Sequence, residues 1–171
     1  TRRGWKVKIL TFDRDKIPEL PDDIGAVRFP DCRLLWFLPW MCKEHGLWAD
    51  VIKTNQSNKV YYYTRAAKIW NKPILLRCGY VQGEYFETTS GFTFKTRLYQ
   101  WFESRAFRQA THCQVPTIEL FDWVNKRYKV QKEKISVVPN FIDTDIFKPI
   151  DGIQKKERSV VSVGRLHPVK Q

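Results

Sequence analysis

Short apolar runs alternate with segments of helical periodicity, and this alternation constrains the fold more than any other feature of the chain. Runs such as 74–77 and 112–115 are too short for helices and suit strands that are buried in a parallel sheet. Short connections between strand and helix imply right-handed crossovers. We therefore predict an α/β fold: a Rossmann-like parallel sheet with helices on both faces.

The expected elements follow from this pattern. Strands are expected at 6–12, 26–29, 50–54, 74–77, 112–115, 134–138 and 159–163. Helices are expected at 32–45, 58–71, 93–110 and 118–128. Residues 13–24 and the Gly- and aromatic-rich residues 79–91 are expected to be loops, and the polar residues 149–158 are expected to form a linker.

Cap and break signals refine the helices. Asp31 is expected to cap the helix 32–45, Pro39 to kink or break it, and Gly46 to end it. Thr117 is expected to cap the helix 118–128. Asp143 is expected to cap the turn formed by the residues directly after Asp143.

The helix 93–110 carries an apolar stripe with the spacing i, i+4, i+7, i+8. The stripe consists of Phe94, Leu98, Trp101 and Phe102, and the cations Lys95, Arg97, Arg105 and Arg108 lie beside it. One interpretation is a stripe that faces the core with a solvated basic face. The other is an exposed surface on which bases stack or with which lipid headgroups pair.

The net charge restricts the kinds of partner that we expect, and the cysteine content bears on metal binding and cellular location. The net charge is +12, from 30 Lys and Arg against 18 Asp and Glu, which favours nucleic acid, anionic lipid or phosphorylated small molecules as partners. The four cysteines form no CxxC and His45, His112 and His167 are scattered, so we expect no metal site and a cytoplasmic protein with reduced thiols. No apolar run approaches the roughly 20 residues that span a bilayer.

In parallel α/β folds, ligands bind at the carboxyl ends of the strands. The residues that follow the expected strands are Asn55 and Gln56, Cys78 to Tyr80, Asn140, and Gly164 to Lys170. A glycine after the last strand allows a sharp turn, and Arg165 and Lys170 make a sensible clamp for a diphosphate. The alternative is a surface turn with two solvated cations.

Two motifs resemble the signature of the family 4 retaining glycosyltransferases of GT-B fold. The first is Val138-Pro139-Asn140 with Ile142-Asp143, Phe147 and Pro149, and the second is Val163-Gly164-Arg165-Leu166 with Lys170. Phe141 stands where the family usually has glycine, and Cys78-Gly79 stands where many members have a histidine. Weaker similarity extends back along most of the chain.

The resemblance implies an organisation and an activity. Residues 1–148 would be an acceptor-side Rossmann-like domain whose first strand–helix unit is missing, and 159–171 the start of the sugar-nucleotide-binding domain. The enzyme, a hexosyltransferase, would transfer a sugar with retention from a nucleotide diphosphate sugar to a cell-envelope glycan or lipid-linked acceptor. It would need no cofactor or metal, because Gly164, Arg165 and Lys170 hold the diphosphate.

The same resemblance indicates which residues would bind the acceptor and where in the cell the enzyme would act. The acceptor-pocket candidates are Asn55, Gln56, Arg77, Cys78, Gly79 and Asn140. The partners would be the nucleotide sugar and the acceptor, with peripheral contact to an anionic membrane on its inner face and no nucleic acid. Two alternatives stay open: a basic nucleic-acid-binding α/β module, and another GT-B nucleotide-sugar protein such as an epimerase.

Overall fold

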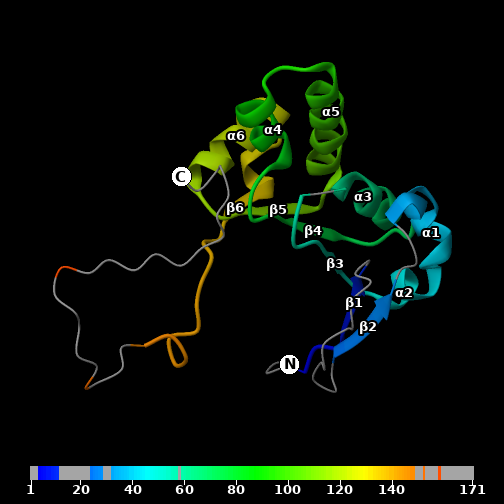
Figure 1. The fold of residues 1–171 in the computed structure, drawn as a ribbon. Coiled ribbons are helices and arrows are strands. Elements are labelled where there is room, and N and C mark those ends of the chain that lie inside the picture. Colours follow the sequence, from blue (N-terminus) through cyan, green and yellow to red (C-terminus); the bar gives the residue numbers. More distant parts are fainter. Residues whose placement is uncertain are drawn as a thin grey trace. The chain divides into compact units, whose positions relative to one another are not determined.

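The computed structural model describes residues 4–11, 24–28, 32–57, 59–148, 152 and 158 (Figure 1). The expected strand 159–163 and nearly all of the expected linker 149–158 lie outside these residues. The chain divides into two units, Thr1–Asn140 and Phe141–Gln171.

The main sheet of the first unit is parallel throughout. Its order is β3-β4-β5-β6, which follows the sequence. The strands are β3 (Ile52–Lys53), β4 (Ile74–Arg77), β5 (His112–Val115) and β6 (Ile135–Val137), the last preceded by the 3-10 helix η2 (Lys132–Lys134). The predicted parallel α/β fold is confirmed, although β3 and β6 are shorter than the predicted strands 50–54 and 134–138.

Three helices pack on this sheet: α3 (Val60–Ile69), α5 (Phe94–Gln109) and α6 (Ile118–Tyr128). Their apolar residues form one core cluster with alternate strand residues such as Leu76 and Cys113. Helices were expected on both faces, whereas these three share one face (Figure 1). Consecutive right-handed crossovers in one direction place every helix on the same side of a sheet.

Two further strands pair with each other near the amino terminus. β1 (Val7–Thr11) and β2 (Ile24–Arg28) form a two-stranded parallel sheet with Ile9 opposite Ala26. The second strand therefore starts two residues earlier than the predicted 26–29. Residues 12–23, most of the predicted loop, lie outside the described part of the chain.

The predicted helix 32–45 is divided into η1 (Cys32–Phe37), α1 (Leu38–Met41) and α2 (Lys43–Trp48). Pro39 occupies the first turn of α1, so the predicted break at this proline is confirmed. Asp31, the expected cap, lies outside the described residues.

Gly46 does not end the helix as predicted, because it lies inside α2. A Cβ at this position would overlap the ring of Trp70, which packs directly against the Gly46 backbone. The indole of Trp70 is also fixed, since its Nε1 donates a hydrogen bond to the Pro39 carbonyl at 2.9 Å. Gly46 is therefore a packing glycine and not a helix terminator.

The prediction of a loop at residues 79–91 is wrong, because α4 (Gln82–Ser90) is a helix. Gly and aromatic content suggested a loop, but the first turn of α4 is stabilised by a contact distant in sequence. The carboxylate of Glu103 on α5 accepts hydrogen bonds from the backbone N–H groups of Gln82 and Gly83. Gly91, at φ +67°, follows the last turn, where a glycine is favoured.

Three of the four residues in the apolar stripe of α5 do not face the core, and the fourth, Phe102, is half-buried. Phe94 is 82% exposed, and Leu98 and Trp101 are also exposed. The buried face has the same helical spacing but is partly polar: it consists of Thr96, Gln100, Glu103, Ala106 and Phe107. The interpretation of a core-facing stripe is therefore wrong, because hydrogen bonds to α4 let Gln100 and Glu103 occupy the interior.

Three short polar side chains accept hydrogen bonds from backbone N–H groups at the start of a helix or turn. Thr93 and Thr117 cap α5 and α6 by accepting from Thr96 N and Leu120 N. In the second unit, Asp143 caps the following turn by accepting from Asp145 N at 3.0 Å. None of the helices in the described part of the chain is long and apolar enough to cross a membrane.

Candidate functional site

Three residues from different strand ends meet at the carboxyl edge of the main sheet. Arg77 ends β4, Asn55 follows β3 and Asn140 follows β6. The Arg77 guanidinium donates from Nη1 to Asn55 Oδ1 at 3.2 Å and from Nη2 to Asn140 Oδ1 at 3.3 Å. Because parallel strands end at one edge, residues that lie 22 and 63 positions apart in sequence share this site.

The positive charge of Arg77 has no carboxylate partner in the described part of the chain. The ion pairs there join Lys126 to Asp122 and Arg127 to Glu87. A guanidinium has five N–H donors, and the two amide oxygens occupy two of them. The remaining donors suit an anionic group or sugar hydroxyls at this edge.

The loops after β3 and β4 lie against each other beside Arg77. Thr54 Oγ1 donates to the Arg77 carbonyl at 3.1 Å. A Cβ placed on Gly79 would lie 3.8 Å from Oε1 of Gln56, so these two residues are neighbours. The structure thus gathers Asn55 and Asn140 around Arg77 and places Gln56 next to Gly79.

Cys78 does not join this group, because its side chain lies in the core cluster at 2% exposure. Burial, together with the nearby Glu103, raises the pKa of the thiol to about 12, so it stays protonated at neutral pH. The Sγ–H is directed to the Gln114 carbonyl. Alternation along β4 explains this, since successive side chains face opposite sides of the sheet.

Gly164, Arg165 and Lys170 lie outside the described residues. The diphosphate clamp therefore stays a prediction.

A buried carboxylate supports the site, and the sequence analysis missed it. Glu103 is 2% exposed and accepts hydrogen bonds from Gln82 N at 3.1 Å, from Gly83 N at 2.7 Å and from the Tyr128 hydroxyl. Burial raises the pKa of this carboxyl, and the hydrogen bonds, that of Tyr128 foremost, act in the opposite direction. Its position on the same helical face as Thr96 and Phe107 was the available signal.

Ser57 connects the two loops at the sheet edge. Its Oγ donates to the Tyr80 carbonyl and accepts from Gln82 N, both at 3.1 Å. Glu103 and Ser57 together fix the loop that leads from Arg77 into α4. Gly83 is required at this junction, because a Cβ there would overlap the Tyr128 hydroxyl and the Glu103 carboxylate.

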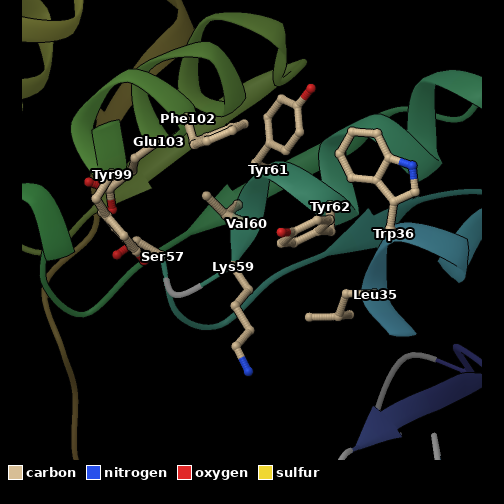
Figure 2. Close-up of a pocket in the computed structure, with 10 residues that line it drawn as sticks. All are labelled: Leu35, Trp36, Ser57, Lys59, Val60, Tyr61, Tyr62, Tyr99, Phe102 and Glu103. Atoms are coloured by element: carbon tan, nitrogen blue, oxygen red, sulfur yellow. The ribbon is translucent and has the colours of Figure 1, made fainter. Parts of the chain in front are cut away.

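A pocket of about 340 Å³ lies between η1, α3 and α5 (Figure 2). Its walls are mostly aromatic, and Ser57 and Glu103 lie at one side of it (Figure 2). The aromatic residues that line it are Trp36, Tyr61, Tyr62, Tyr99 and Phe102. No sequence motif predicts this pocket, because its rings come from three separate elements.

The described residues contain no group of three or more His, Cys, Asp or Glu side chains that could hold a metal ion.

A parallel sheet with polar and cationic side chains at its carboxyl edge defines a Rossmann-like α/β protein with a ligand site at that edge. The family model described as Glycosyltransferase Family 4 matches residues 1–146, and the chain belongs to this family. It is therefore a glycosyltransferase of GT-B type. No curated protein matches the chain.

Proposed function

We propose that this protein transfers a sugar, a hexose, from a nucleotide diphosphate sugar to an acceptor with retention of the anomeric configuration. The observation that supports the acceptor side is the convergence of Asn55, Arg77 and Asn140 at the carboxyl edge of the sheet. In GT-B enzymes the two Rossmann-like domains face each other across a cleft, so this edge would form the acceptor wall.

The proposed acceptor is a cell-envelope glycan or a lipid-linked sugar. Arg77 would bind an anionic or hydroxyl group of the acceptor, while Asn55 and Asn140 hold the guanidinium in place. Gln56 and Gly79, which adjoin this cluster, would shape the pocket. The buried Cys78 would contribute packing only.

The proposed donor side begins at residue 159. Gly164 would let the backbone approach the diphosphate, and Arg165 and Lys170 would stabilise the negative charge that develops on the leaving group. Two cations in these positions would replace a metal ion. We also propose that the enzyme acts in the cytoplasm and contacts the inner face of the cell membrane, which the net charge of +12 supports.

The test is an assay of the complete enzyme with a panel of nucleotide sugars and candidate acceptors. We expect release of a nucleoside diphosphate that depends on the acceptor, a product with the anomeric configuration of the donor by NMR, and unchanged activity in a metal chelator. An inverted product, or activity that a chelator abolishes, would contradict the corresponding part of the proposal.

A further inference from the structure

A continuous row of aromatic rings crosses the first unit on its surface. Trp36 of η1 lies 6.2 Å from Tyr62 of α3 between ring centroids, and Tyr62 lies 5.9 Å from Tyr61. Tyr61 in turn lies 5.0 Å from Phe102 of α5. Trp101 lies 4.9 Å from Phe102 between ring centroids, and Trp40 adjoins Trp36 through the Arg65 guanidinium, which lies over both rings. We call these residues the aromatic band, with Trp40 and Trp101 at its two ends.

Both ends of the aromatic band are open to solvent. Trp40 is 61% exposed and Trp101 is 49% exposed. At the α5 end the band continues into the exposed Leu98 and Phe94, which lie about one and two turns before Trp101. Exposed large apolar side chains that lie along one row favour a contact surface, because soluble proteins seldom leave such side chains together in water.

Cations are stacked on the rings at both ends. The Arg65 guanidinium lies 4.5 Å from the Trp36 ring centre and 5.5 Å from that of Trp40. The Arg105 guanidinium lies 4.9 Å from the Trp101 ring centre. An exposed tryptophan ring therefore carries a cation at each end of the band.

The elements of the band carry almost no negative charge. Helices α1, α3 and α5 contain six cations, Arg65, Lys68, Lys95, Arg97, Arg105 and Arg108. Their one acidic residue is Glu103, which is buried and bonded to α4. The surface is thus complementary to a negatively charged partner.

We propose that the aromatic band is the surface with which this protein binds an anionic lipid bilayer. Trp and Tyr rings favour the boundary between headgroups and acyl chains, because one part of each ring system is apolar and another is polar. Cations beside them bind the anionic headgroups. The aromatic band would make the membrane contact that is part of the proposed function. Binding of lipid by the band does not require glycosyl transfer.

A bilayer suits this surface better than a nucleic acid. Arg65 and Arg105, the cations that stack on the rings, lie at the two ends of the band and not along its middle. The middle of the band is an apolar pocket bordered by Tyr61, Tyr62 and Phe102 (Figure 2).

The experiment measures cosedimentation of the purified protein with vesicles. One set contains phosphatidylcholine with about 30% phosphatidylglycerol, a fraction that gives an appreciable negative surface potential, and the other contains phosphatidylcholine alone. We expect the wild type to bind the anionic vesicles and to bind less as salt is raised. The double variant Trp40→Ser/Trp101→Ser should bind at least tenfold more weakly.

A charge variant separates the contribution of the cations to vesicle binding from that of the aromatic rings. Arg97→Gln/Arg105→Gln should weaken binding to anionic vesicles several-fold and leave binding to phosphatidylcholine unchanged. The matched controls are Ile118→Ser, an exposed apolar residue of α6, and Lys126→Gln on the same helix. Both controls should bind as the wild type does, and all variants should keep the wild-type urea midpoint.

Four results would overturn the proposal. They are no binding of the wild type, equal binding of the wild type and the tryptophan double variant, equal losses in the α6 controls, and no dependence on the anionic lipid. Binding of random single-stranded DNA that the same double variant abolishes, without vesicle binding, would assign the band to nucleic acid. Loss of self-association in that variant, again without vesicle binding, would assign it to a second copy of the chain.

Activity distinguishes this proposal from the proposed function. With a water-soluble acceptor, the tryptophan double variant should turn over as the wild type does, whether or not it binds vesicles.

Discussion

At the scale of single residues, Glu103 shows how one buried carboxylate organises a site that it does not enter. Its oxygens accept from two backbone N–H groups of α4 and from the Tyr128 hydroxyl. The segment 78–81, which leads into α4, begins directly after Arg77. The position of the Arg77 guanidinium therefore depends on a residue of the opposite, helical side of the sheet.

Replacing Glu103 by alanine should destabilise the fold strongly. The Gly83 N–H group and the Tyr128 hydroxyl would be left without an acceptor, whereas Gln82 N would keep Ser57 Oγ, and each buried unsatisfied polar group costs about 1–3 kcal/mol. We expect a loss of roughly 3–5 kcal/mol in the free energy of unfolding, measured by urea denaturation. Glu133→Ala, at an exposed position of η2, is the control. A loss below about 1 kcal/mol would show that the network is not required.

The pH dependence of stability should also report Glu103. Burial raises its pKa above 4.5, so in the window between 4.5 and the folded-state pKa the folded chain keeps a proton that the unfolded chain has released. Stability from this group is therefore present below pH 4.5 and is lost as pH rises through the folded-state pKa. Glu103→Gln removes the titration. The stability of the wild type minus that of the variant should decrease as pH rises from 4.5 to 7; an increase would contradict the raised pKa.

Arg77 should govern the acceptor and not the donor. Arg77→Gln keeps a polar side chain but removes the charge, and a hydrogen bond to a charged group contributes about 1.5–3 kcal/mol. We expect kcat/KM for the acceptor to fall roughly 10–150-fold, with the Kd for the nucleotide sugar unchanged. Lys126→Gln on α6 should behave as the wild type. Weaker nucleotide-sugar binding in Arg77→Gln would place this residue on the donor side.

At the scale of secondary structure, the sequence predicts best where pattern and packing agree. Strands 74–77 and 112–115 and helix 118–128 match the structure residue for residue. Each is a short apolar run or a capped amphipathic segment whose local preference coincides with its burial. Local signals were sufficient because no distant contact opposes them.

The wrong predictions arise where a distant contact determines the structure. Residues 82–90 form a helix whose N-terminus Glu103 caps from another element, and Gly46 packs under Trp70 instead of ending α2. On α5, two stripes of equal helical spacing compete, and the polar one is buried because α4 satisfies its hydrogen bonds. A single-sequence pattern contains no information about these partners.

Gly46→Ala tests the packing role directly. In an ordinary helix interior this change would stabilise by about 0.8–1 kcal/mol, because alanine has the higher helix propensity. Here the new Cβ would overlap the Trp70 ring, which a hydrogen bond to Pro39 holds in place. We expect a destabilisation of about 1–3 kcal/mol by urea denaturation. A stabilised variant would mean that Trp70 moves aside without cost.

At the scale of the whole molecule, the order of the parallel strands predicted the strand-end cluster better than the residue types at the strand ends did. Parallel order alone is enough to bring Asn55, Arg77 and Asn140 to one edge. It does not decide which side of the sheet a side chain faces, and so it did not separate Arg77 from the buried Cys78. The aromatic pocket and the Glu103 network combine side chains from elements that no sequence motif connects.

Separate variants can test the proposed donor side and the proposed acceptor side of the active site. Arg165→Ala or Lys170→Ala in the complete enzyme removes a contact to charge that develops on the departing diphosphate. Loss of one such donor in an oxyanion site costs about 2.7–4 kcal/mol, so kcat/KM should fall by on the order of a hundredfold or more. The loss should appear mainly in kcat, because the contact strengthens in the transition state, whereas Arg77→Gln should act on the acceptor. Steady-state release of the nucleoside diphosphate measures both, with Lys148→Ala as a cation control near the same segment. Wild-type turnover in Arg165→Ala and in Lys170→Ala would remove the diphosphate clamp from the mechanism and leave the acceptor edge to be judged on Arg77 alone.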